Sequence, residues 1–409
     1  MVKFIPWNAI LSSLVADQRL LPLLSEVLQA ILNAGSARWS DIARKMRGTE
    51  AAAYKRIQRL VARFDPWPVV TRLCAEQAPF VIADMTDIER PHAYRTPYVG
   101  LLPPKEKLGQ GHRKATKAQA SSAGQKGSQT VRRKARRGFW LLVLGVPFRG
   151  RVLPCAWRTF SSRTLGEQVT SQNTEVEQAL YALKDLLRGR ALVFDRGFHN
   201  RRFFAWLQRL AIPFVARVRM KPHPLVLTTE DGERLQPVLL RGETRIWRAM
   251  THHELRDLTL IGHWPEEMPE PLWLLTTWPD AQQALAWYLY RMKIEETFRD
   301  WKALLGIEAN MNRRWLWMDR TMGLVILAYA IALLAGELLR DALWGSGLPE
   351  DWHTWRRPQA PKRAWYQFSG LFVLLRKKAS LPASLRRRWR RLLARFPQFL
   401  LQAPVQTFV

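Results

Sequence analysis

Hydrophobic positions at the start of the chain recur at the spacing of an α-helix, most clearly over 20–32. A short helix is predicted over 41–47 with Ser40 as its cap, and a longer helix over 50–64. Residues 1–70 are therefore expected to form a helical domain.

From residue 79 onward, short apolar runs alternate with helical stretches. The runs predict strands over 80–84, 139–146, 151–157, 191–194 and 213–218, the second and third forming a hairpin around Gly150. Helices are predicted over 175–187 and 200–210. This alternation predicts an α/β fold, in which helices pack on a mixed sheet.

The remaining chain changes character twice. Residues 219–279 are β-rich and irregular, and they lead into a helix over 288–302. The chain is helical again from about residue 320. We therefore expect three regions: 1–70, 71–320 and 321–409.

The charge balance identifies the class of partner. The 409 residues include 64 Lys and Arg against 34 Asp and Glu, a formal net charge of +30. This excess predicts nucleic acid or an anionic membrane surface. The longest apolar stretch, 322–336, is shorter than the about 20 residues that span a bilayer and is predicted to be a buried helix. Nucleic acid is thus favoured, with no membrane.

The N-terminus and the cysteines indicate the compartment. Pro6, Asn8 and Asp17 interrupt the first apolar residues, which argues against a signal peptide. Cys74 and Cys155 are far apart and have no neighbouring His, so we expect two core thiols in a reducing cytoplasm.

A helix-turn-helix DNA reader is one interpretation of the N-terminal region. Gly48 makes a short turn before a helix that carries Lys55, Arg56, Arg59 and Arg63. Many small helical bundles share this pattern, so DNA binding by Lys55, Arg56 and Arg59 is a hypothesis supported by the total charge.

Two other segments are strongly basic. Residues 105–137 hold eleven Lys or Arg against one acid, and they favour a mobile loop that neutralises phosphates over a merely solubilising insertion. A helix around 385–395 surrounds Trp389 with arginines. Whether that helix binds DNA or a second protomer is left open.

The most specific pattern lies in the helix over 288–302. Tyr288, Arg291, Glu295 and Lys302 have offsets of zero, three, seven and fourteen residues. At about 100° per residue they fall within an arc of roughly 60°. A carboxylate beside two cations suits a site that binds metal and phosphate together, although a surface helix with ion pairs would show the same stripe.

Helical geometry also separates the two adjacent glutamates. Glu296 lies about 100° away from Glu295 and groups with Lys293 and Asp300, which we expect on the solvent side. Glu295 is therefore the predicted working carboxylate.

Two further acids follow apolar runs. Asp84 directly ends the run at 80–84, with Asp87 as its competitor, and Asp195 ends the run at 191–194. If Asp84, Asp195 and Glu295 converge, their repulsion requires a cation, which predicts Mg²⁺, or Mn²⁺ in its place. Two such ions about 3.5–4 Å apart would catalyse phosphodiester cleavage. The alternative is that each Asp is only a turn or cap residue.

Three segments resemble the insertion-sequence-four family of bacterial DDE transposases. YLYRMKIEETFRDWK (288–302) is similar to its Tyr-x2-Arg-x3-Glu-x6-Lys signature, while ADMTDIER (83–90) and VFDRGF (193–198) resemble its two aspartate motifs. The resemblance implies an RNase H-like core over 71–320, with 219–279 as a β-rich insertion between helical terminal regions.

The resemblance also implies the roles of individual residues. Asp84, Asp195 and Glu295 would be the catalytic metal-binding triad. Tyr288, Arg291 and Lys302 would contact phosphates near the cleaved end, with Arg299 as a further basic contact. In some members a Trp in the strand before the signature holds a flipped base; here Leu272 occupies that position, with Trp273 one residue away.

The reaction that the resemblance implies is cut-and-paste transposition. Water nicks the transposon end, the new 3′-OH forms a hairpin with the opposite strand, and the reopened end joins target DNA. The implied partners are terminal inverted repeats, target DNA and a second copy of the chain. The implied location is the bacterial cytoplasm, at the nucleoid when DNA is bound.

Two alternatives remain open. The chain could be a catalytically inactive, transposase-derived DNA-binding protein, although its intact acids argue against this. It could also be a structure-specific nuclease that cuts without joining.

Overall fold

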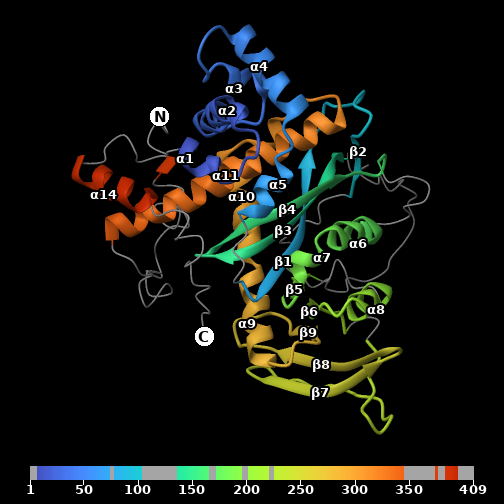
Figure 1. Cartoon of the computed structure of the whole chain (residues 1–409). Coiled ribbons are helices and arrows are strands. Elements are labelled where there is room, and N and C mark those ends of the chain that lie inside the picture. Colours follow the sequence, from blue (N-terminus) through green and yellow to red (C-terminus); the bar gives the residue numbers. More distant parts are fainter. Residues whose placement is uncertain are drawn as a thin grey trace, which may run out of the picture.

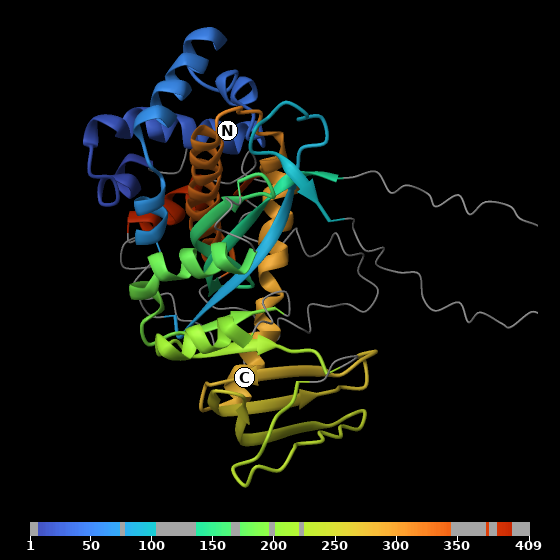
Figure 2. The ribbon, with the colours of Figure 1, turned by 90° about the vertical axis from the view of Figure 1, so that its right-hand side faces the viewer.

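A computed structural model describes residues 7–73, 78–103, 136–164, 172–195, 201–220, 225–344, 374–375 and 383–394 (Figure 1). The chain forms a mixed α/β structure: N-terminal helices at one end, a large sheet in the middle and a β-rich extension at the other end (Figure 2). The predicted α/β fold class is confirmed, and the arrangement is compatible with an RNase H-like core.

The described strands form a single sheet with nine strands. They are β1 (Phe80–Glu89), β2 (Gly100–Leu102), β3 (Arg136–Phe148), β4 (Arg151–Phe160), β5 (Ala191–Phe194), β6 (Phe214–Arg217), β7 (Thr244–His252), β8 (Leu255–His263) and β9 (Leu272–Thr276).

The sheet order is β2-β3-β1-β5-β6-β9-β8-β7, and β4 also pairs with β3. Strands β1, β5 and β6 run parallel, whereas the other neighbouring strands are antiparallel. The predicted hairpin is β3–β4, and the predicted β-rich insertion supplies β7, β8 and β9, which extend the sheet beyond β6.

Helices lie on both sides of the sheet, with α6 (Gln172–Ala182), α7 (Lys184–Leu187) and α8 (Arg201–Arg209) opposite α9 (Ala281–Arg291) and α10 (Lys293–Leu304) (Figure 2). Two-sided coverage explains why the central strands β5 and β6 are almost wholly buried. It also leaves the ends of these strands as the places where polar side chains can meet.

The N-terminal helices are α1 (Trp7–Ser12), α2 (Leu21–Ala34), α3 (Trp39–Ala43), α4 (Glu50–Arg63) and α5 (Trp67–Arg72), with a short η1 (Gln18–Leu20) before α2. The predicted cap at Ser40 is wrong, because α3 begins after Arg38 and Ser40 lies inside the helix. Instead, the Thr49 hydroxyl caps α4 by accepting a hydrogen bond from Ala52 N–H at 3.3 Å.

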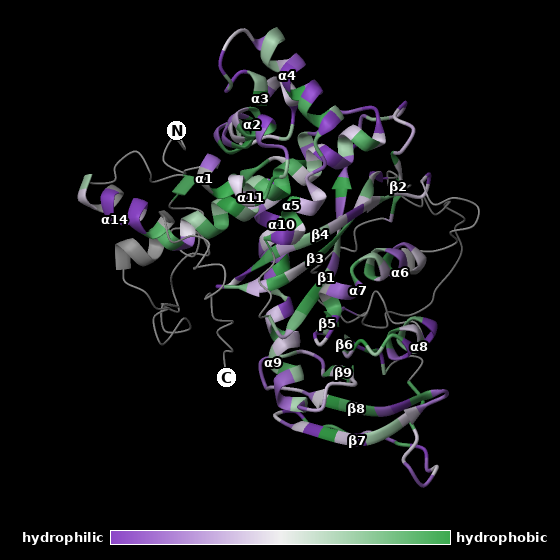
Figure 3. Ribbon diagram, in the orientation of Figure 1, coloured by the Kyte–Doolittle hydropathy of each residue, from purple (hydrophilic) through white to green (hydrophobic). Residues whose placement is uncertain are grey.

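The long helix α11 (Trp315–Trp344) lies between the N-terminal helices and the sheet (Figure 3). It is longer than the predicted apolar stretch, and its segment Trp315–Leu339 is long and apolar enough to cross a membrane. Its most apolar part is nevertheless buried inside the protein, which agrees with the predicted buried helix, while Trp315 and Leu316 at its start are exposed. At Gly323 an added Cβ would lie 2.3 Å from Trp157, so glycine permits close packing of α11 on β4.

The helix α14 (Ala383–Ala394) packs on α11 through Trp389, whose indole N–H donates to the Ala335 carbonyl at 3.1 Å. Its arginines at 387, 388, 390 and 391 are exposed. Residues 105–135 of the predicted basic loop lie outside the described residues, as does Cys74. The last two residues of that predicted loop, 136 and 137, are not loop but the start of β3. The expected free thiol at Cys155 is wrong, because this cysteine is disulfide-bonded.

Candidate active site

The parallel pairing of β1 with β5 brings two aspartates together. The last pair in the register joins Ala83 to Phe194, and Asp84 and Asp195 are the next residues of the two strands. Neighbouring parallel strands in register direct paired side chains to the same face. The two carboxylates therefore lie side by side at the end of β5.

The expectation that Asp84 ends its strand is wrong. Strand β1 continues to Glu89 because residues 82–89 pair with β3. Asp87 is three residues further on and faces the opposite side. There its carboxylate forms an ion pair with Arg136 at 2.9 Å. Only Asp84 of the two competitors is directed toward Asp195.

The third acid comes from a helix that differs from the prediction. The expected continuous helix over 288–302 breaks at Met292, which separates α9 from α10. Asp280 caps the start of α9 by accepting from the N–H groups of Gln282 and Gln283. Glu295 lies in the first turn of α10, directly beyond the break.

The Arg291 guanidinium contacts all three acids. Its distances are 2.6 Å to Asp84 Oδ2, 3.7 Å to Asp195 Oδ2 and 3.9 Å to Glu295 Oε1. The side chain of Arg291 is only 4% exposed, whereas that of Glu295 is 51% exposed. Three carboxylates that are distant in sequence thus surround one buried cation.

Tyr288 forms a hydrogen bond with one of these acids. Its hydroxyl donates a hydrogen bond to Asp195 Oδ1 at 2.8 Å. Burial raises the pKa of Tyr288 above its usual range, so the hydroxyl stays protonated and remains a donor. Tyr288 therefore orients Asp195.

Burial also raises the pKa of Asp84 to about 6. The Arg291 charge and the Met85 N–H oppose this shift, while Asp195 and Glu295 add to it. The carboxyl group of Asp84 therefore changes charge close to neutral pH.

This pKa predicts the pH dependence of metal binding. Below pH 6 a bound metal must displace the Asp84 proton, so affinity for Mn²⁺ should fall about tenfold per pH unit, and it should level off above about pH 7. Mn²⁺ titrations at a series of pH values measure this directly. A Mn²⁺ affinity that stays constant down to pH 5 would contradict this prediction. The same pH dependence of the affinity in Asp84→Asn would also contradict it.

The cluster opens into a groove of about 690 Å³. Besides the three acids and Arg291, Lys302 and Arg299 line it. The Lys302 ammonium donates to the Asp87 carbonyl at 2.7 Å and lies 3.6 Å from Glu308, and Arg299 pairs with Glu296 at 2.6 Å. Acids and cations thus line the same groove.

The predicted DNA-contacting residues of α4 lie elsewhere. Lys55 and Arg59 are exposed on this helix. Arg56 is held by Glu26 at 2.8 Å and donates to the Arg47 carbonyl. Arg56 thus ties α4 to α2 in addition to any contact with DNA.

The expected solvent position of Asp300 is wrong. Its side chain is buried, and Oδ2 accepts from Arg151 Nε at 2.9 Å. The reason is that β4 packs against that side of α10, where Thr297 also accepts from Val152 N–H at 3.1 Å. Glu296 remains at the surface beside Arg299.

Some residues of the site were not anticipated. Thr86 lines the groove together with Phe298. Thr86 follows Asp84 by two residues, and the two-residue period of a strand could have identified it. Trp273 packs on Trp247 with ring centroids 5.9 Å apart, in the insertion and not among the residues lining the groove.

The donor set suits a hard divalent cation. Three carboxylates balanced by the single guanidinium of Arg291 leave an excess of negative charge, and carboxylate oxygens are preferred by Mg²⁺ and Mn²⁺. Within the described residues, no group of three Asp, Glu, His or Cys side chains is close enough to hold one metal ion. For Asp84, Asp195 and Glu295 the reason is that the Arg291 guanidinium lies between them. The chemistry of the site fits a metal once this guanidinium moves aside.

Comparison of the sequence with known proteins identifies its family. No curated protein matches the chain significantly. Residues 77–331 match the family described as the transposase DDE domain. The match covers more than half of the chain and includes all three acids: Asp84 in β1, Asp195 directly after β5, and Glu295 in α10. On this evidence the chain belongs to the transposase DDE domain family.

Proposed function

We propose that this protein is a DNA transposase that moves an insertion sequence by cut-and-paste transposition at terminal inverted repeats. The observation that carries the proposal is the convergence of Asp84, Asp195 and Glu295 on Arg291 in an open groove. The net charge of +30 supports DNA as the substrate.

Each residue has a role in this proposal. Asp84, Asp195 and Glu295 would hold two Mg²⁺ or Mn²⁺ ions, and these ions would activate the attacking oxygen and stabilise the leaving oxygen. Tyr288 keeps Asp195 oriented through its hydrogen bond. Arg291, Arg299 and Lys302 neutralise phosphate oxygens of the DNA strand.

The proposed chemistry is a series of displacements at phosphorus. Water first attacks a phosphodiester, a new P–O bond forms, and the P–O bond to the 3′ oxygen breaks to leave a 3′-OH. This hydroxyl then attacks a phosphodiester of the opposite strand, which closes a hairpin and displaces the 3′ oxygen of the flanking DNA as a hydroxyl. Water reopens the hairpin and releases the same 3′-OH, which attacks a phosphodiester of the target DNA and displaces a target 3′ oxygen. One site serves every step because each is an attack of an oxygen on a phosphodiester.

Other parts of the chain would hold the DNA and a second protomer. Lys55 and Arg59 of α4 and the exposed arginines of α14 are candidate contacts for the inverted repeats. A homodimer would pair the two ends of the element. We place the protein in the bacterial cytoplasm, at the nucleoid when bound to DNA, since its substrate lies there.

A cleavage and joining assay tests the proposal. Purified protein is mixed with labelled duplexes that carry the inverted repeats flanking the coding region, with Mg²⁺ and a plasmid target. A transposase nicks the end, forms a hairpin and joins it to the plasmid. Cutting without joining would identify a nuclease, and binding without cutting in Mg²⁺ or Mn²⁺ would identify an inactive DNA-binding descendant.

A further inference from the structure

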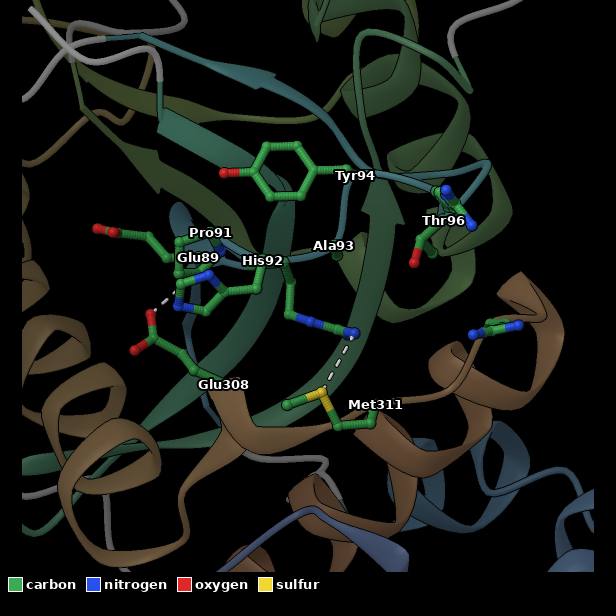
Figure 4. Close-up of a pocket in the computed structure, with 11 residues that line it drawn as sticks. Glu89, Pro91, His92, Ala93, Tyr94, Thr96, Glu308 and Met311 are labelled. Carbon is green, nitrogen blue, oxygen red and sulfur yellow. Dashed lines mark hydrogen bonds between the residues drawn. The ribbon is translucent and has the colours of Figure 1, made fainter.

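A second hollow lies beyond the far end of β1. Its volume is about 520 Å³, and it is enclosed by the turn after β1 and by the segment that follows η3 (Ile307–Ala309). Figure 4 shows Tyr94, His92, Thr96 and Met311 around this space. None of the three catalytic acids lines it.

The wall of this hollow contains a buried arginine without an acidic partner. Arg90 is 5% exposed. Its guanidinium donates to the Tyr98 hydroxyl at 3.5 Å and to Met311 Sδ at 3.7 Å, and it pairs with no carboxylate in the described part of the chain. A buried cation is costly unless an anion compensates it. The site therefore has the charge of a receptor for an anion.

The other charges around the hollow strengthen this conclusion. Arg95 and Arg313 are exposed at its rim, and neither forms an ion pair within the described residues. The two acids that line it are already engaged: Glu89 pairs with Arg136 at 2.7 Å, and Glu308 lies 3.6 Å from Lys302. Three arginines consequently remain for a ligand.

The hollow also offers apolar surface. The Tyr94 ring is 63% exposed, with the Arg137 guanidinium 4.8 Å from its centre, and Met311 is 56% exposed. Large exposed apolar side chains beside cations are suited to a sugar or base next to its phosphate. The combination fits a nucleotide of a DNA strand better than a small inorganic anion.

Lys302 connects this hollow to the catalytic groove. It lines the groove, donates to β1 at Asp87 and approaches Glu308 of the hollow. From Asp84 to Arg90 the extended strand covers about 20 Å. Since phosphates of one DNA strand follow each other at about 3.4 Å along the helix axis, the two sites are about six base steps apart.

We propose that this hollow binds a backbone phosphate of the DNA about six base steps from the cleaved phosphate, with Arg90, Arg95 and Arg313 as its contacts. The inference rests on the proposed function, because it assumes that the groove holds the cleaved strand. It adds a positioning site that fixes how far the DNA extends past the acids. Its residues act on placement of the DNA and take no part in bond cleavage.

The test uses the full-length protein and a labelled duplex of about 20 base pairs, long enough to cover both sites. Affinity is measured by fluorescence anisotropy over a range of NaCl concentrations for wild type and Arg95→Ala/Arg313→Ala. The double variant should lose affinity on the order of tenfold, and the slope of log affinity against log salt should decrease by about two. Arg188→Ala/Arg209→Ala is the matched control and should keep the wild-type slope, because Arg188 directly follows α7, Arg209 ends α8, and neither lines the hollow.

Arg90 provides an independent measurement. Because its charge lacks an acidic partner, Arg90→Met should weaken DNA binding while the thermal midpoint stays unchanged or rises. A lowered midpoint with unchanged DNA affinity would show a structural role and overturn the proposal. An unchanged salt slope in the double variant would do the same.

Two further experiments, phosphate binding and DNA cleavage, separate the remaining explanations. Calorimetry with inorganic phosphate alone tests for a free-anion site; tight binding there, with DNA binding unaffected by the substitutions, would reject DNA as the ligand. Cleavage of end DNA by wild type is measured separately. If the double variant has a smaller salt slope but the wild type does not cleave end DNA, the hollow binds DNA and the transposase proposal is rejected. If the wild type cleaves end DNA but the double variant keeps the wild-type salt slope, the transposase proposal stands and the DNA-binding role of the hollow is rejected.

Discussion

Replacement of Asp195 by Asn is expected to reduce nicking of end DNA by at least about a thousandfold, because one charged ligand of the proposed metal ions is lost. The substitution keeps the size of the side chain and an oxygen that can accept the Tyr288 hydroxyl bond. Affinity for the DNA duplex should therefore stay within about twofold, since phosphates are bound by the cations of the groove. Single-turnover nicking in Mg²⁺ and anisotropy without metal measure the two effects.

Asp87→Asn is the matched control. Asp87 lies on the same strand as Asp84 but on the opposite face, where it pairs with Arg136. Its variant should nick at the wild-type rate, while Asp84→Asn should be as inactive as Asp195→Asn. Loss of nicking in Asp87→Asn together with activity in Asp84→Asn would exchange the roles of the two residues.

The sequence allowed the two aspartates to be paired for a physical reason. Each ends an apolar run that is typical of a buried strand, and acids at the ends of adjacent strands can converge. The adjacency itself comes from the fold, because β2, β3 and β4 separate β1 from β5 along the chain. The extent of β1 was not predictable in the same way. Residues Met85 to Glu89 are mostly polar and half-buried, and they are strand only because β3 pairs with them.

The helix that carries Glu295 shows the same limit. No Gly or Pro marks the break at Met292, so local sequence contains no signal for it. The burial of Asp300 follows from packing of α10 on β4, and a helical projection of one segment contains no information about its neighbours. Spacing placed Arg291 on the stripe of Glu295, yet only the fold shows that its nearest partner is Asp84.

That position of Arg291 leads to the second large effect. Arg291→Met should destabilise the metal-free protein by about 3–5 kcal/mol, because three neighbouring carboxylates lose the cation that holds them together. The loss should be largest above about pH 7, where Asp84 is ionised, and should shrink as the pH falls and the carboxyl groups take up protons. Thermal unfolding at a series of pH values follows both changes.

Divalent metal should reverse much of this loss. With the guanidinium gone, Mn²⁺ can take its place between the acids, and a concentration a hundredfold above its dissociation constant returns about 2.7 kcal/mol. The midpoint of Arg291→Met should therefore rise with Mn²⁺ by more than that of the wild type, in which the metal must first displace Arg291.

Arg151→Met separates this effect from simple loss of a buried arginine. Arg151 pairs with Asp300 at 2.9 Å, and their side chains are only 11% and 2% exposed. Its removal should also destabilise the fold, yet Mn²⁺ should not restore stability, because a single buried carboxylate is a poor site for a divalent ion. Equal rescue of both variants, or no rescue of Arg291→Met, would mean that the three acids do not form a metal site. The guanidinium would then be a structural ion-pair partner, and the assignment of the acids to catalysis would lose its physical basis.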